Sequence, residues 1–128
     1  MTHEDRERLL KDLGGRLPYG VKILDIPTNV VGKLFLISTT DTVQYETADD
    51  TGIQTLYNIK PYLFPLSSMT EEEQRTLDSM CNGVEMVSRL SGLKMFDKAF
   101  NWLNENHFDY RGLIEKGLAI DATGLNIY

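Results

Sequence analysis

The hydrophobic pattern of the first residues is helical. Through residues 2–13, leucines recur at three- and four-residue steps, which is the spacing of an amphipathic helix. Thr2 and Asp5 are three residues apart, as in a capping box, where side chain and backbone at a helix start bond reciprocally. Gly14-Gly15 predicts the end of this helix, because glycine readily adopts the left-handed conformation that terminates helices.

The pattern then changes to alternation of hydrophobic and polar positions, the period of a strand with one buried face. Short polar turns divide this region and predict four strands, at residues 21–26, 30–38, 42–47 and 53–59. The turns are too short for the helical crossovers that join parallel strands. We therefore expect a four-stranded antiparallel meander, either an open sheet or a small barrel.

An apolar segment bounded by prolines follows at residues 61–66, Pro-Tyr-Leu-Phe-Pro-Leu. Proline cannot donate a backbone hydrogen bond and is therefore rare in central strands. We expect this segment to be an extended connector that packs on the core.

The second half of the chain returns to helical spacing. Thr70 and Glu73 have capping-box spacing, and hydrophobic residues then recur over about 18–20 positions until Ser91-Gly92. A further helix is expected over residues 94–107, and a short last helix over residues 109–116. Together these features predict an α+β fold, with an N-terminal helix and two to three C-terminal helices packed on the sheet.

The last segment, residues 119–128, keeps the apolar side chains of Ile120, Leu125, Ile127 and Tyr128. Chain ends that are not tied down are usually poorly ordered. So much apolar content indicates a tail that docks on its own domain or contacts a partner.

Composition indicates one globular domain over residues 1–128, since 41% of residues are hydrophobic and 25% are charged. The net charge is −6 and no stretch is strongly basic, which argues against broad nucleic-acid binding, because phosphate contacts need clustered Lys and Arg. The N-terminus is highly charged and no apolar run approaches the ~20 residues that cross a bilayer. We expect a cytoplasmic protein without a membrane partner.

Candidate chemistry is sparse. Cys81 falls on the apolar stripe of its expected helix, where a free cysteine acts as a small hydrophobe. His3 and His107 are the only histidines, and no second ligand has a metal-site spacing. Asp109 is interpreted as a helix cap, and His107 as a C-terminal helix residue that the partial negative charge there favours. We expect no metal, no cofactor and no enzymatic activity.

Residues 102–111 combine tryptophan, tyrosine and arginine, the residue types that dominate binding hot spots. One interpretation makes these side chains a surface for an unknown protein partner or for self-association. The other, favoured by the usual burial of tryptophan, places their helix between the sheet and the helix that begins near Thr70. The candidate partner-binding residues are Trp102, His107, Tyr110, Arg111 and Tyr128.

Two further functions remain open beside a non-enzymatic protein–protein interaction module. A small specific nucleic-acid-binding protein could use Tyr45 or Tyr57 as stacking platforms on a curled sheet. An enzyme could bring His107, Asp109 and Arg111 together in one solvent-open cleft.

Three blocks of sequence carry a resemblance: residues 17–20 (Leu-Pro-Tyr-Gly), residues 60–72 and residues 102–119. In these blocks the chain resembles short hypothetical proteins of gut Bacteroides phages and mobile elements. The resemblance implies a phage or mobile-element protein in bacterial cytoplasm, and it implies no activity.

Overall fold

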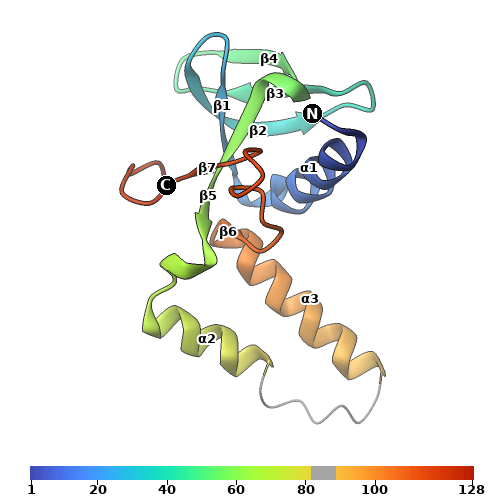
Figure 1. Ribbon diagram of the computed structural model, residues 1–128, viewed down its shortest axis with the longest axis vertical. Coiled ribbons are helices and arrows are strands. Elements are labelled where there is room, and N and C mark those ends of the chain that lie inside the picture. Colours follow the sequence, from blue (N-terminus) through green and yellow to red (C-terminus); the bar gives the residue numbers. More distant parts are fainter. Residues whose placement is uncertain (82–88) are drawn as a thin grey trace.

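A computed structural model describes residues 1–81 and 89–128 of the chain. The sheet and helix α1 form one end of the molecule, and helices α2 and α3 extend from the other end (Figure 1). The helices are α1 (His3–Arg16), α2 (Glu71–Cys81) and α3 (Arg89–Glu105). The strands are β1 (Lys22–Asp25), β2 (Val30–Ile37), β3 (Thr42–Glu46), β4 (Thr51–Thr55), β5 (Ile59–Pro65), β6 (Phe108–Asp109) and β7 (Ile120–Asp121).

Helix α1 begins with the expected capping box. The Asp5 amide donates to Thr2 Oγ1 at 3.1 Å, and the Thr2 amide donates to the Asp5 carboxylate at 3.4 Å. The expected end at Gly14-Gly15 is wrong, because the helix continues to Arg16, whose side chain is fully buried. Tertiary contacts of Arg16 thus outweigh the local preference of the two glycines, and the first left-handed glycine is Gly20, with φ of 71°.

The sheet has seven strands in the order β4-β3-β2-β1-β5-β6, with β7 also paired to β5. Strands β1 to β4 form the expected antiparallel meander, and β5 adds to β1 in antiparallel orientation. The short strands β6 and β7 pair parallel with β5. The sheet is therefore open and mostly antiparallel, and the expectation of four strands was too small.

The fourth strand differs from the expected one at residues 53–59. Strand β4 ends at Thr55, and Leu56 enters the core through a 3-10 turn at Leu56–Asn58. In the β3–β4 register Ile53 lies opposite Gln44, on the face away from α1, and its side chain is 66% exposed. The alternation therefore indicated a strand, and the hydrophobic side chain of Ile53 lies on its exposed face.

Strand β5 occupies the segment expected to be a connector, and its prolines are compatible with pairing. Along one edge, the Asn58 carbonyl accepts from the residue after β1, and the Phe64 amide donates to the residue before β6. Along a strand, the backbone groups of successive residues point to opposite edges. Pro61 and Pro65 are an odd number of residues away from Asn58 and Phe64, so the proline nitrogens face the other edge of β5. On that edge β7 pairs only with residues 62–63. Neither proline therefore removes a bond to β1 or β6, which explains why the prediction of a connector was wrong.

The core lies between α1 and the inner face of the sheet, and the loop after β6 closes it. Val43 and Tyr45 of β3 both point into this core and are buried. The buried cluster contains Leu9, Leu13, Val21, Ile23, Leu34, Val43, Tyr45, Leu56, Ile59, Leu63, Leu113, Leu118 and Ala119.

Tyr45 lies across two glycines of the neighbouring strands. A Cβ atom added to Gly32 or to Gly52 would overlap the Tyr45 ring. The Tyr45 hydroxyl donates to the buried carboxylate of Asp25 at 2.6 Å, which fixes the ring in place. The missing side chains of these glycines are thus what lets a buried tyrosine lie flat on the sheet.

We expect Gly32→Ala to lower the free energy of unfolding by about 1–3 kcal/mol, because the added methyl group overpacks a buried ring. Gly14→Ala is the matched control, since a Cβ atom at Gly14 meets nothing within 4 Å and alanine favours the helix by up to about 1 kcal/mol. Urea unfolding of the three proteins gives both values. Equal stability of Gly32→Ala and the wild type would contradict the packing of Tyr45.

Helix α2 begins with the expected capping box, in which the Glu73 amide donates to Thr70 Oγ1 at 3.1 Å and the Thr70 amide donates to Glu73 at 2.9 Å. The helix is described up to Cys81, and the rest of the expected 18–20 residues lies partly outside the described residues. Cys81 is exposed, so its assignment to the core was wrong. The reason is that α2 packs on α3 and not on the sheet, and no residue of α2 is buried.

Helix α3 continues through Ser91-Gly92, where a helix end was expected. It contacts α2, α1 and the edge strand β6, so α3 meets the sheet through β6 and does not cover the meander (Figure 1). Ala99 and Leu103 of α3 are buried, whereas Phe96 and Phe100 are 49% and 45% exposed. No helix of residues 1–81 and 89–128 is both long and apolar enough to cross a bilayer.

The expected last helix over residues 109–116 is absent from the described structure and is replaced by turns. Asp109 belongs to β6, and its carboxylate accepts from the amides of Leu113 and Ile114, both at 2.9 Å. These two bonds satisfy the turn backbone from within a strand, so the carboxylate organises a loop and not a helix start. The tail after it docks on the domain through β7 and Ala122, which is buried.

Candidate partner-binding site

An open cavity of about 370 Å³ lies where four distant segments of the chain meet. The start of α2, the end of α3, the β5–β6 pair and the C-terminal tail each contribute to its wall. The lining residues are Phe64, Ser68, Glu73, Glu105, Asn106, His107, Phe108, Thr123, Gly124 and Tyr128. We refer to this feature as the tail cavity.

Tyr128 connects the tail to the sheet. Its hydroxyl accepts from the Lys22 amide at 2.9 Å and donates to the Tyr62 carbonyl at 2.7 Å. The Lys22 amide and the Tyr62 carbonyl lie on the facing edges of β1 and β5. At this point β1 begins, and further along β5 the same edge is paired with β6. Burial of the hydroxyl raises its pKa to about 12, while 42% of the residue as a whole stays exposed.

His107 lies two residues after α3 in a left-handed conformation, with φ of 62°. Its ring stacks on the Tyr128 ring, with centroids 3.7 Å apart and planes 11° apart. Burial, helped by the charges of Arg16 and Lys22, lowers the His107 pKa from 6.5 to about 4. The imidazole is therefore neutral near pH 7, and the expectation that a partial negative charge holds it at a helix end was wrong.

Trp102 supports the cavity from behind and does not line it. Its ring stacks on Phe108, with centroids 5.7 Å apart and planes 22° apart. Phe108 in turn lies 6.2 Å from Phe64, whose ring is 5.9 Å from Tyr128. Trp102 is thus partly buried against the sheet strand β6, on a helix that also packs on α2.

Tyr110 and Arg111 lie on another side of β6, against α1. The Arg111 guanidinium is 5.1 Å from the Tyr110 ring centroid, and its Nε is 3.5 Å from Asp12 Oδ1. The Arg16 guanidinium is 5.4 Å from the same ring. Of the five candidate residues, the structure therefore brings His107 and Tyr128 together at the tail cavity and places Tyr110 and Arg111 elsewhere.

Several residues of the tail cavity carried no functional signal in the sequence. Phe64 belonged to the expected connector, and Glu73 was explained as a capping residue, a role that it does have.

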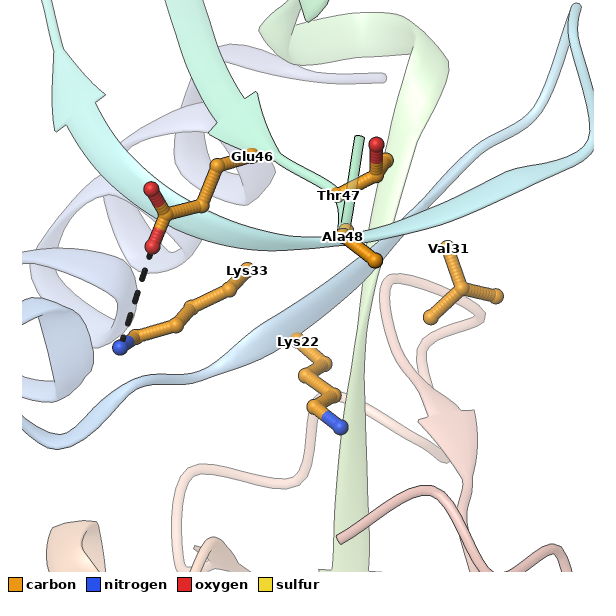
Figure 2. Close-up of a pocket in the computed structure, with 7 residues that line it drawn as sticks. Lys22, Val31, Lys33, Glu46, Thr47 and Ala48 are labelled. Carbon is orange, nitrogen blue, oxygen red and sulfur yellow. Dashed lines mark ion pairs between the residues drawn. The ribbon is translucent and has the colours of Figure 1, made fainter. Parts of the chain in front are cut away.

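A second hollow, of about 280 Å³, lies on the sheet beside the β3–β4 turn (Figure 2). Lys33 and Glu46 face each other across it at 4.0 Å, and both side chains are about half exposed. An ion pair of this kind contributes roughly 0–1 kcal/mol. Lys22 donates its Nζ to the Ile127 carbonyl at 2.7 Å, so one of the two lysines is already engaged with the tail.

The residues proposed for the two other functions do not form the sites required. His107 lines the tail cavity, Asp109 is buried under its own loop, and Arg111 lines a different hollow beside α1, so the three share no described cleft. Tyr45 is buried and cannot stack on a base. Tyr57 is half exposed and its hydroxyl donates to Asp41 at 3.2 Å.

No protein-family model, curated protein or solved structure matches this chain. The geometry of the tail cavity is therefore the basis on which a function can be assigned. Its aromatic wall, its two carboxylates and its construction from distant segments are the features to be explained.

Proposed function

We propose that this chain is a non-enzymatic protein–protein interaction module whose partner docks over the tail cavity. The observation that supports this most is that four distant segments build one open cavity of about 370 Å³ with aromatic walls. Concave, largely apolar sites with a few polar groups are where proteins bind their ligands. Tyrosine and other aromatic residues are enriched in the core of protein interfaces.

Exposed apolar side chains next to the cavity in sequence favour a protein partner. Leu66 precedes Ser68 and is 45% exposed, and Leu125 follows Gly124 and is 50% exposed. With Tyr128, they give the cavity an apolar margin of the kind that a partner covers.

Among the described residues that line the tail cavity, no nucleophile is bonded to a base, since the Ser68 hydroxyl donates to the Pro65 carbonyl at 2.7 Å, and this favours a binding role over catalysis. His107 is held by stacking on Tyr128, and Cys81 is not among the described residues that line the tail cavity. Nucleophilic catalysis requires a nucleophile and a base within hydrogen-bond reach.

We also propose that the protein acts in bacterial cytoplasm, in a phage or mobile element. This proposal rests on the resemblance of residues 17–20, 60–72 and 102–119. Two of these blocks supply walls of the tail cavity, which is what a family with a shared binding site would require.

Partner retention by surface variants tests the proposal. We expect Leu66→Asp to reduce retention of a native partner from extracts of the source cells at least about tenfold, because a charge on the apolar margin must be desolvated. Ile53→Asp is the matched control, since Ile53 is 66% exposed on the sheet face away from α1. Quantitative mass spectrometry of both pull-downs beside the wild type gives the ratio.

Two outcomes would contradict the proposal. If the wild-type chain retains no partner and sediments as a monomer, it is not an interaction module. If Ile53→Asp loses the partner and Leu66→Asp keeps it, the partner docks on the sheet and not over the tail cavity.

A further inference from the structure

We infer that the tail cavity receives the side chain of an arginine from the partner protein. This inference rests on the proposed function and specifies the chemistry that the partner must present. It follows from the charges and the ring faces that line the cavity.

The charged groups of the cavity wall are acidic. Glu73 comes from the first turn of α2, and Glu105 is the last residue of α3, so the two carboxylates approach from different helices. One Glu73 oxygen accepts from the Thr70 amide at 2.9 Å, which orients the side chain. Among the described residues that line the cavity, none is a lysine or an arginine. A cation in the cavity would therefore meet attraction and no lining charge of its own sign.

The other walls suit a flat cation. Phe64, Phe108 and Tyr128 line the cavity together with the neutral ring of His107. A cation within about 6 Å of an aromatic ring face is attracted to it, and arginine makes such contacts more often than lysine. The guanidinium is planar, stacks on rings and binds carboxylates through two parallel hydrogen bonds, so it can use both kinds of wall at once.

Two basic groups near the cavity, Lys22 and Arg16, already have bonding partners. Lys22 Nζ lies 5.9 Å from the Tyr128 ring centroid and donates to the Ile127 carbonyl at 2.7 Å. Arg16 is fully buried and donates to Asp12 at 2.8 Å. Neither side chain lines the cavity, so both leave its space open to a guanidinium, and their charges, which also lower the His107 pKa, are opposed there by the two lining carboxylates.

Nuclear magnetic resonance with a minimal probe tests the inference. N-acetyl-arginine amide is titrated into the full ¹⁵N-labelled chain, and the neutral isostere N-acetyl-citrulline amide is the control ligand. We expect saturable shifts at His107 and at the Trp102 indole with the arginine probe, and none with citrulline. Equal shifts with both probes, or none with arginine, would overturn the inference.

Two variants test whether binding of the arginine probe depends on a carboxylate of the cavity wall. Glu105→Gln should weaken binding of the arginine probe about fivefold, the effect of losing one carboxylate contact in a solvent-exposed setting. Glu115→Gln is the matched control, because Glu115 is also exposed and lies outside the cavity wall. Unchanged binding by Glu105→Gln would contradict the inference. If the arginine probe does not bind but Leu66→Asp still abolishes retention of the partner, the inference of an arginine is wrong and the proposed function is retained.

Discussion

Replacing Arg16 with methionine is expected to lower the free energy of unfolding by about 3–5 kcal/mol. Arg16 and Asp12 are both fully buried, and Arg16 Nε donates to Asp12 Oδ2 at 2.8 Å. The Arg16 guanidinium also donates to the Phe108 carbonyl at 2.6 Å. Methionine keeps much of the side-chain volume but has no hydrogen-bond donor. The buried carboxylate of Asp12 and the buried carbonyl of Phe108 would each lose the donor that Arg16 provides. Urea unfolding near neutral pH measures the loss.

Arg111 does not compensate for this loss. Its Nε lies 3.5 Å from Asp12 Oδ1, and neither atom has a hydrogen-bond partner in the described structure. Burial already raises the Asp12 pKa, and removal of Arg16 takes away the strongest influence that lowers it. Proton uptake by Asp12 in the variant will therefore limit the loss toward the lower end of the range.

The control for this prediction is Arg75→Met, since Arg75 is 79% exposed and 3.7 Å from Glu71. Such an exposed pair contributes about 0.5 kcal/mol or less. The double variant Asp12→Leu/Arg16→Met should recover most of the lost stability, because apolar side chains can replace a buried pair without penalty. A single Arg16→Met variant within about 1 kcal/mol of the wild type would show that the pair does not hold α1 to β6.

Lowering the pH from 6.5 to 4 is expected to reduce the free energy of unfolding by about 3 kcal/mol through the protonation of His107 alone. The unfolded histidine takes up its proton near pH 6.5, whereas burial lowers the pKa in the folded state to about 4. Between these values the unfolded state binds more protons, so stability falls as the pH falls. The contribution is complete above pH 6.5 and is lost progressively toward pH 4.

Urea unfolding at several pH values tests this slope. His107→Asn should remove the fall in stability, because asparagine does not titrate and tolerates the left-handed backbone of this position, with φ of 62°, while the raised pKa of Asp12 acts in the opposite direction and is unchanged. His3→Asn is the control and should keep the slope. The lowered pKa values of Asp25 and Asp41 act below 3.8, outside this window. Identical slopes for His107→Asn and the wild type would contradict a buried, neutral His107.

Local signals in the sequence predicted local structure well. The capping boxes of Thr2–Asp5 and Thr70–Glu73 form as expected, and the four polar-bounded alternations are strands of an antiparallel meander. In each case the residues that interact are close in sequence, so their spacing contains the information. Which face of the sheet is covered depends on distant partners, as at Ile53, which lies on the face away from α1 and is exposed.

The pairing of β5 with β6 and β7 could not be predicted from the sequence, because these two strands are short and lie far from β5 along the chain. Strand β5 is paired by β6 and β7, two-residue strands that show no alternation of their own. The assignment of Cys81 to the core assumed that α2 meets the sheet, but α2 meets α3. The tail cavity was visible only through the unusual composition at His107 and Tyr128, because its two carboxylates had adequate local explanations.

The position of the Tyr128 hydroxyl couples the tail cavity to the middle of the sheet. Along the edge of β5, the place between β1 and β6 is filled by a side-chain oxygen where a neighbouring strand would otherwise continue. A partner side chain that binds against the Tyr128 ring is therefore expected also to restrain the Lys22 amide, which donates to the hydroxyl of the same side chain. By thermodynamic linkage, the order of that amide and the occupancy of the cavity rise and fall together.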